Sequence, residues 1–165
     1  DLLFIKNIFL IIICQYNLPI MKEHLYLKDD QLKEYIEKIF VSYKKSFDDA
    51  KKVLNKHKIG IAHHKAIHLI SLHKGITVSE LLNKLNVTKQ SLNRVLKDLI
   101  NLETIYFKKN ETDSRLKHLF LSNKGSKIFD EIFCVQKKRI YKAFINSDSN
   151  EVICFNKVLK KIINE

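Results

Sequence analysis

The amino-acid sequence predicts a mainly α-helical fold with one short β-hairpin. Glycine and proline occur only 3 and 1 times in 165 residues, so the chain is poor in the residues that turns and many-stranded sheets require. Apolar side chains recur at helical spacing along most of the chain. After Glu103 the pattern changes to β-branched, aromatic and alternating residues, which indicate strands. A chain of this length forms one domain, with or without extended arms, and can bury a core.

The first twenty residues differ from the rest of the chain. The sequence starts at Asp1, and its single methionine is Met21. The apolar run 8–14 is far too short to span a bilayer, which takes about 20 apolar residues. We interpret residues 1–20 as a non-native or upstream extension of the reading frame; an ordered arm and a targeting or anchoring segment are the alternatives. Residues 21–165 are then a single domain.

A long first helix is expected from Asp29 or Asp30, because acidic side chains stabilise the first turn of a helix. Its apolar residues recur three and four positions apart, close to a heptad pattern, which indicates one face that packs on another helix. These residues are Leu32, Ile36, Ile39, Tyr43, Phe47, Ala50 and Leu54. A second helix follows at about 61–73, and Gly75 is the kind of residue that ends a helix.

Two further helices with a tight turn between them form a helix-turn-helix pattern. Thr77 and Glu80 have the T-x-x-E spacing of a capping box at the start of the first helix. Asn86 and Val87 break the pattern, and Thr88 is a good N-cap for the second helix. That second helix has an apolar inner face and a polar, basic outer face. The inner residues are Leu92, Val95, Leu96, Leu99 and Leu102, and the outer ones are Lys89, Gln90, Ser91, Asn93, Arg94 and Lys97.

The outer face of the second of these helices indicates contact with DNA. Gln, Ser, Asn and Arg are side chains that hydrogen-bond to the edges of bases. An ordinary solvated helix face is the alternative. Residues 104–109 and 116–122 are expected to form a β-hairpin around the polar turn 110–115. A hairpin placed directly after such a helix is the arrangement of a winged helix.

The formal net charge of +12 points to a polyanionic partner, either nucleic acid or an anionic membrane. Codon bias is the alternative source of much of this charge, because lysine, isoleucine and asparagine have A/T-rich codons. Such a bias does not explain where arginine is kept. Arg94 lies on the candidate DNA-reading helix, where its guanidinium could hold guanine or a phosphate with two hydrogen bonds. Arg115 lies at the hairpin, where a narrow minor groove would attract it.

Residues 126–165 are expected to form two more helices, joined by the polar segment 147–151. Their apolar stripes consist of Ile128, Phe129, Ile132, Phe133, Ile140 and Phe144, and of Val152, Phe155, Val158, Leu159 and Ile162. A lone chain would expose this surface together with the stripe of the first helix. We therefore expect residues 29–58 and 126–165 to be dimerisation helices, and residues 61–125 to be a DNA-binding lobe.

The stretch from His64 to Gly125 resembles the MarR family of bacterial transcriptional regulators. Three motifs carry the resemblance: "TVSELLNKLNVTKQSLNRVLKDL", the D-x-R of Asp113 and Arg115, and "LFLSNKG" at residues 119–125. The resemblance extends more loosely over residues 29–165. It implies a homodimeric winged-helix protein that binds palindromic operators, with the recognition helix in the major groove and the wing arginine in the minor groove.

Two departures from the family pattern bear on the predicted site. Glu103 stands where the family usually has glycine, so the recognition helix is expected to end differently or to run longer. Ser114 separates Asp113 from Arg115, where the family wing often carries D-R-R, and this lowers the charge available for the minor groove. Asp113 is expected to orient Arg115, to pair with a cation of the recognition helix, or to be a simple turn residue.

The predicted fold class is therefore mainly α: a winged helix-turn-helix with a short β-hairpin wing, flanked by long N- and C-terminal helices that form a dimerisation region. The predicted function is a cytoplasmic, sequence-specific transcriptional regulator that binds double-stranded DNA as a homodimer on palindromic operators. The alternatives are a less specific DNA-architectural protein, a ligand-, redox- or metal-responsive regulator of this class, and a peripheral membrane protein, although no membrane partner is expected. The predicted DNA-binding residues are Thr88, Lys89, Gln90, Ser91, Asn93, Arg94, Lys97, Lys108, Lys109, Asp113, Arg115 and Lys117.

Neither catalysis nor a cofactor is expected. The chain has no phosphate-binding glycine loop, no dinucleotide fingerprint and no G-x-S-x-G nucleophile motif. His64 and His68 are four residues apart on a predicted helix, which makes them weak metal candidates because no Asp, Glu or Cys lies near them in sequence. The odd number of cysteines indicates a reducing compartment. Cys134 and Cys154 are expected to be small core residues, with redox sensing as the alternative, and an unidentified small-molecule effector is a further candidate partner.

Overall fold

The computed structural model describes residues 28–109 and 117–163. The chain divides into two compact units, residues 1–44 and 45–165, and helix α3 (Asp29–Lys56) runs through the boundary between them. The segment 1–20, with its predicted role as an extension or arm, lies outside the described residues.

In the first unit, the described residues form the N-terminal part of α3. Asp29 and Asp30 occupy its first turn, as predicted from their effect on the helix dipole. Lys38 pairs with Glu34 one turn earlier at 2.6 Å, an exposed pair that holds the pKa of Glu34 below its usual value. The apolar residues of this part are exposed, and they include Leu32, Ile36, Ile39, Phe40 and Tyr43.

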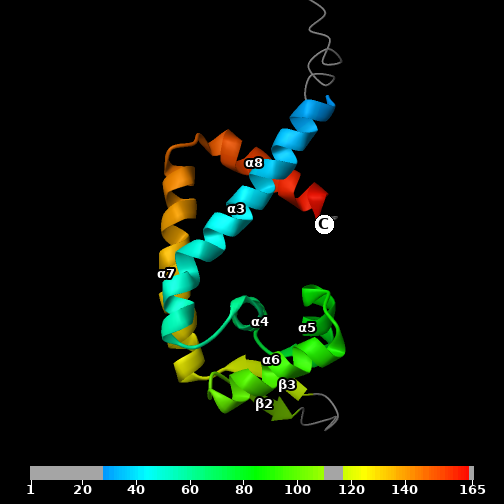
Figure 1. The fold of residues 1–165 in the computed structure, drawn as a ribbon, viewed down its shortest axis with the longest axis vertical. Coiled ribbons are helices and arrows are strands. Elements are labelled where there is room, and N and C mark those ends of the chain that lie inside the picture. The colour runs from blue at the N-terminus through cyan, green and yellow to red at the C-terminus, as the bar shows by residue number, and fades with distance from the viewer. Residues whose placement is uncertain (1–27, 110–116, 164–165) are drawn as a thin grey trace, which may run out of the picture. The chain divides into compact units, whose positions relative to one another are not determined.

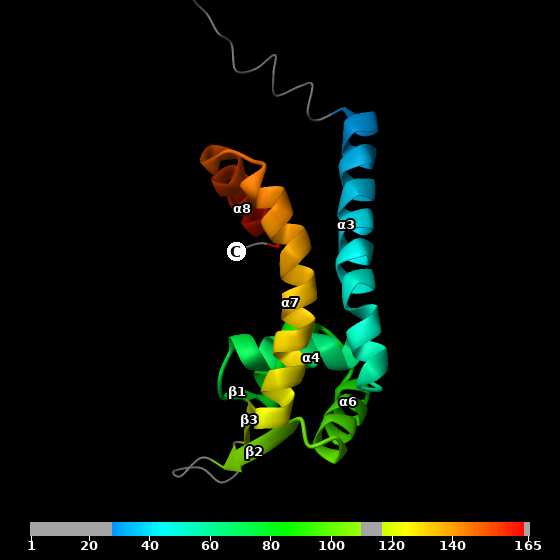
Figure 2. The ribbon, with the colours of Figure 1, turned by 90° about the vertical axis from the view of Figure 1, so that its left-hand side faces the viewer.

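The second unit contains the rest of α3, five more helices and a small sheet. Its elements are α4 (Ile61–Leu72), β1 (Ile76–Thr77), α5 (Val78–Leu85), α6 (Lys89–Asn101), β2 (Ile105–Lys109), β3 (Lys117–Leu121), α7 (Asn123–Ile145) and α8 (Ser149–Ile162). The sheet is antiparallel in the order β1-β3-β2. Figure 1 and Figure 2 show α7 rising from the sheet, with α8 turning back at its far end. The predicted mainly α fold with a short antiparallel hairpin is confirmed, and the two-residue strand β1 is an element that the sequence pattern did not predict. The dimerisation role of the flanking helices stays a prediction.

Side-chain caps set where the helices of the second unit begin. Thr77 accepts a hydrogen bond from the Glu80 amide, while the Glu80 carboxylate accepts from the Thr77 amide at 2.8 Å, so the predicted capping box is present. Thr88 caps α6 through the Ser91 amide, also as predicted. Ser122 and Asp148 cap α7 and α8 in the same way. Each cap satisfies an amide that the first turn of a helix leaves without a partner.

The core of the second unit lies where α4, α5, α6 and the sheet meet. Ile67, Leu81, Leu92, Leu99 and Leu119 come from four different elements, and each is no more than 1 % exposed. The base of α7 adds its own apolar side chains to this cluster, namely Ile128 and Ile132. The helix-turn-helix and the strands are therefore held by one shared core, with burial as the main stabilising term.

A close backbone approach joins the start of α7 to the end of α6. A Cβ atom at Gly125 would lie 2.0 Å from the carbonyl oxygen of Thr104, so only glycine fits this position. Thr104 is fully buried, and its hydroxyl donates to the carbonyl of Leu99 at 2.7 Å. The Ser122 amide donates to the same Thr104 carbonyl. The glycine of the "LFLSNKG" motif thus permits α7 to dock on the loop that follows α6.

Polar contacts tie the second-unit part of α3 to α7. The Arg139 guanidinium donates two hydrogen bonds to the Asp49 carboxylate, at 2.5 Å and 2.8 Å, and this fork lowers the pKa of Asp49. The Gln136 amide donates to the Ser46 carbonyl at 2.9 Å. Near the end of α3, Glu131 accepts from Lys56 at 2.9 Å. The third arginine of the chain therefore has a structural partner rather than a free surface position.

The expectation that Cys134 and Cys154 are core residues is wrong for this chain. Both side chains are exposed, on α7 and α8. Their places in apolar stripes led to the expectation, but these stretches of α7 and α8 are largely uncovered. No residue of α8 is buried, and Phe155, Val158 and Ile162 are each more than half exposed. An apolar helical stripe predicts burial only where something packs on it.

Candidate nucleic-acid interface

The turn between α5 and α6 sets the direction of α6. Asn86 ends α5 in the left-handed conformation, with φ of 49°, and its amide donates to the last turn of α5. Asparagine tolerates this conformation better than most residues. Thr88 then caps α6, while Leu92, Leu96 and Leu99 fix the buried face of the helix in the core. The opposite face of α6 is consequently held toward solvent.

The outer face of α6 exposes every side chain that the sequence assigned to it. These residues are Lys89, Gln90, Ser91, Asn93, Arg94 and Lys97, together with the capping Thr88. The only acidic residue of α6 is Asp98. The resulting surface is polar and positively charged, and it places on a single helix side chains of the types that can hydrogen-bond to base edges and to phosphates. Contact of these residues with DNA stays a prediction.

The β2–β3 hairpin follows α6 directly. Lys108 pairs in register with His118 across the strands, and Lys109 with Lys117. The side chains of Lys108 and Lys117 are exposed, and the Lys117 ammonium lies 5.6 Å from the ring centre of Phe107. The predicted wing residues Asp113 and Arg115 lie outside the described residues, so their roles stay predictions.

A groove of about 590 Å³ lies between the start of α5, the start of α6 and the first residue of β3. It is lined by Ser79, Lys89 and Lys117, among others. The Thr77 hydroxyl, which also lines it, already donates to Glu80 at 2.8 Å. Ser79 was not among the predicted DNA-binding residues. It is a hydroxyl residue in the first turn of α5, where main-chain amides also favour anions.

The sequence of the chain is similar to that of known transcriptional regulators, in the helix-turn-helix region and beyond it. The MarR family model matches residues 57–116, which include α4, the helix-turn-helix and strand β2 of the hairpin. The HTH-type transcriptional regulator PetP from Rhodobacter capsulatus is 37 % identical over 140 residues, which cover 85 % of this chain and 84 % of PetP.

The chain belongs to the MarR family.

Solved MarR-family structures have the same fold. Wild-type MarR from E. coli matches with a TM-score of 0.58 at 23 % identity, over 76 % of this chain and 94 % of that one. A mutant of the E. coli protein in complex with operator DNA matches with a TM-score of 0.60 at 22 % identity, over 81 % and 96 %. At these identities the likeness establishes the winged-helix fold. Together with the family assignment, it makes this chain a MarR-family, helix-turn-helix transcriptional regulator.

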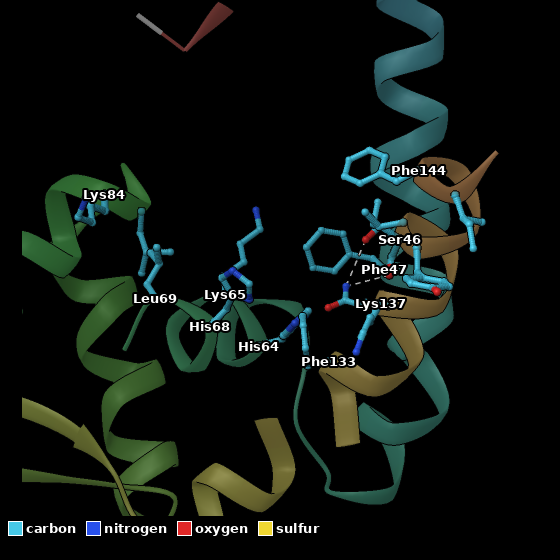
Figure 3. A pocket seen from close by; sticks show the side chains of 15 residues that line it. Ser46, Phe47, His64, Lys65, His68, Leu69, Lys84, Phe133, Lys137 and Phe144 are labelled. Carbon is cyan, nitrogen blue, oxygen red and sulfur yellow. Dashed lines mark hydrogen bonds between the residues drawn. The ribbon is translucent and has the colours of Figure 1, made fainter. Parts of the chain in front are cut away.

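A second concave site in this MarR-family protein lies between α3, α4, α5 and α7, within the second unit. The pocket has a volume of about 900 Å³. Figure 3 shows Phe47, Phe133 and Phe144 on one side of it, with His64, Lys65 and His68 along α4. The lining contains three lysines and no carboxylate, so an anionic group would be favoured inside it.

Burial disfavours the charged form of the two histidines of this pocket. His64 is 3 % exposed, and burial lowers its pKa to about 4, with a further contribution from the neighbouring His68. Burial also lowers the pKa of His68. Their ring centres are 6.3 Å apart. Within the described part of the chain, no group of three or more metal-binding side chains forms around this weak metal candidate.

The described helices include none that is both long enough and apolar enough to cross a membrane.

Proposed function

We propose that this MarR-family regulator acts as a homodimer that binds palindromic operator DNA in a sequence-specific manner. The observation that carries the proposal is the outer face of α6, where Gln90, Asn93 and Arg94 project from a helix whose opposite face is locked in the core. A rigid helix of this kind can enter the major groove and present hydrogen-bonding side chains to base edges.

The other charged residues have supporting roles in this proposal. Arg94 is expected to hold guanine or a phosphate with its two-pronged guanidinium. Lys108, Lys109 and Arg115 of the wing are expected to follow the minor groove and its phosphates, with Asp113 orienting Arg115. Ser79, Lys89 and Lys117 line one groove, which supports its use as a seat for a backbone phosphate.

Dimerisation is supported by apolar side chains that the single chain leaves exposed. On α8 the exposed set is Ile153, Phe155, Val158, Leu159 and Ile162, and α3 and α7 add others such as Ile36, Phe40 and Tyr141. Exposed apolar surface of this extent marks a protein–protein interface. A second copy of the chain is the expected occupant, because a two-fold dimer would also present two α6 helices to a palindromic site.

Regulation by a small molecule is a second proposal, favoured by the pocket between α3, α4, α5 and α7. Its apolar walls and three lysines suit a small organic anion. A structure of MarR from Staphylococcus aureus, in complex with salicylate and kanamycin, has a similar fold. It matches with a TM-score of 0.64 at 21 % identity, over 83 % of this chain and 95 % of that one. Binding of salicylate to the full chain, measured by calorimetry, tests this proposal directly.

Selection of bound sites from a random pool of DNA tests the main proposal. A palindromic consensus with half-sites about 10 bp apart is expected, because two recognition helices would enter successive major grooves on one face of the duplex. An architectural protein would yield no consensus and would lose its DNA to random competitor. Affinity should fall steeply with salt, since the lysines displace counterions from phosphates.

Substitution of two arginines tests which surface of the protein contacts the major groove and which contacts the minor groove. Arg94→Ala should cost about 1–3 kcal/mol per base contact and relax the choice of base at one position of each half-site. Arg115→Ala should weaken binding mainly at A/T-rich flanking sequence. Lys51→Ala, on the exposed side of α3, is the control and should change little. Unchanged affinity and unchanged site preference in both arginine variants would refute the proposed DNA-binding surface.

A further inference from the structure

Helix α6 carries one acidic side chain, Asp98, one turn after Arg94 and next to Lys97. The Asp98 side chain is 56 % exposed. A carboxylate on a helix that approaches phosphates is repelled by them, and the repulsion is largest when its charge has no partner. The sequence pattern alone gives no reason for an acid at this place.

A histidine from another helix contacts this carboxylate. The Nε2 atom of His63, on α4, lies 3.2 Å from Oδ2 of Asp98. The Gly60 amide donates to Nδ1 of the same ring at 3.1 Å. Because Nδ1 accepts this hydrogen bond, the neutral ring carries its proton on Nε2 and donates it to Asp98.

The position of His63 in α4 explains why the ring is held so firmly. Gly60 is the N-cap of α4 and has no side chain with which to cap the helix. His63 is the third residue of α4, and its ring accepts a hydrogen bond from the Gly60 amide, as the third-position side chain of a capping box does. With the His63 side chain only 20 % exposed, the ring has little freedom to turn away from Asp98.

We propose that His63 is a positioning residue for DNA binding. It draws the Asp98 carboxylate back against α4, so that the acid neither faces the phosphates nor pairs with the cations of the outer face of α6. Arg94 and Lys97 are thereby kept available to DNA. The inference rests on the proposed entry of α6 into the major groove, and it adds a residue of α4 to the set that determines affinity.

A double-mutant cycle on operator affinity tests this inference. The full chain and its variants are titrated against the consensus duplex obtained by site selection, and binding is followed by fluorescence anisotropy. His63→Ala should weaken binding about two- to five-fold, the range expected for a partly exposed charge–dipole contact. In the Asp98→Asn background, the same change should have no further effect, because no carboxylate is left to control. His63→Gln should restore most of the affinity, because its amide can donate to Asp98.

Two controls separate positioning from general damage. His57→Ala removes another histidine–carboxylate contact, the one with Glu131 at 3.0 Å, which involves no residue of α6. His57→Ala should shift the thermal midpoint of the protein about as much as His63→Ala does, but it should leave the affinity for DNA unchanged. Equal effects of His63→Ala in both Asp98 backgrounds, or none in either, would overturn the inference. If Arg94→Ala weakens binding while His63→Ala does not, only this inference fails; if neither variant weakens binding, the proposed use of α6 fails as well.

Discussion

His64 is a buried histidine whose two ring nitrogens have no hydrogen-bond partner among the described residues. It packs edge-on against Phe47, with ring centres 5.3 Å apart. Burial in these surroundings disfavours the charged form of the ring, and repulsion from His68, once that ring is also protonated, adds to the effect. The folded protein therefore prefers His64 neutral, with a pKa of about 4 against an ordinary value of 6.5.

This pKa difference makes stability depend on pH. Between pH 6.5 and pH 4 the unfolded chain binds a proton at His64 that the folded chain does not, so the free energy of unfolding falls as pH falls through this window. The loss is on the order of 3 kcal/mol, at 1.36 kcal/mol for each pKa unit. The pH dependence from this site fades as pH rises above 6.5, because the unfolded chain then also loses the proton.

Urea unfolding at several pH values measures the effect. His64→Phe keeps an aromatic ring next to Phe47 but cannot be protonated, so its free energy of unfolding should fall less steeply between pH 6.5 and pH 4. The difference between the two curves isolates His64 from the carboxylates that titrate in the same range. Parallel curves would show that burial of His64 has no energetic consequence.

Sequence alone identified some of these residues better than others. The outward position of Arg94 followed from helical spacing, because its neighbours Leu92, Val95 and Leu96 had to face inward. The contacts of His63 with Asp98 join residues 35 positions apart, and no local pattern encodes them. Cys134 was misplaced for a related reason, since its burial depends on a partner that the sequence of one chain does not display.

At the scale of the element, the end of α6 shows how this helix terminates with Glu103 in place of the glycine that is usual in the family. The helix ends at Asn101, and Glu103 adopts the left-handed conformation with φ of 55°. Its amide donates to Ile100 at 2.8 Å, and the next amide, of Thr104, donates to Leu99 at 2.9 Å. The helix therefore stops where a glycine would stop it, and does not run longer. A side chain at this backbone conformation costs about 1–2 kcal/mol.

Glu103→Gly should consequently stabilise the protein. Relief of the strained backbone exceeds the entropy that an added glycine contributes to the unfolded chain, so a net gain of about 0.5–1 kcal/mol is expected. Thermal or urea unfolding measures it. Glu37→Gly places the same substitution inside α3, where it should destabilise by about 1 kcal/mol. If both variants are destabilised, the contacts of the Glu103 side chain stabilise the fold by more than the backbone strain destabilises it.

Helices α3, α5 and α6 were predictable because each combines a favourable residue at its start with a periodic apolar face. Thr77, Thr88 and the acidic start of α3 marked helix starts to within one residue. Strand β1 was missed because its two residues, Ile76 and Thr77, are too few to show an alternating pattern. It forms because Ile76 pairs with Leu119 of β3, a contact set by the tertiary fold.

At the scale of the whole molecule, the distribution of buried side chains shows which parts of a single chain are stabilised by a core of their own. The buried apolar residues run from Ala50 to Ile132, and the described parts of the chain on either side of this range contribute none. Half or more of the side-chain surface of Ile36, Tyr141 and Phe155 is exposed. These residues would be covered in the proposed homodimer.

Thermal stability should therefore depend on the concentration of the protein. Subunits that pair when folded shift the unfolding equilibrium by mass action, so the thermal midpoint should rise with each tenfold increase in concentration. Scanning calorimetry from low micromolar to high micromolar concentration measures this rise, and sedimentation velocity checks the mass directly. A well-folded monomer with a constant midpoint would contradict the proposal.

The absence of any buried residue in α8 has a consequence for the lifetime of the protein. A newly made subunit would present this apolar helix to proteases and chaperones until it meets a second copy, because nothing within α8 is held by a core. Unpaired chains would then be removed faster than paired ones. The concentration of paired, active regulator would then rise more steeply than the rate of synthesis. Control of the operator would begin only above a threshold concentration of the chain, and this threshold would be set by the pairing equilibrium.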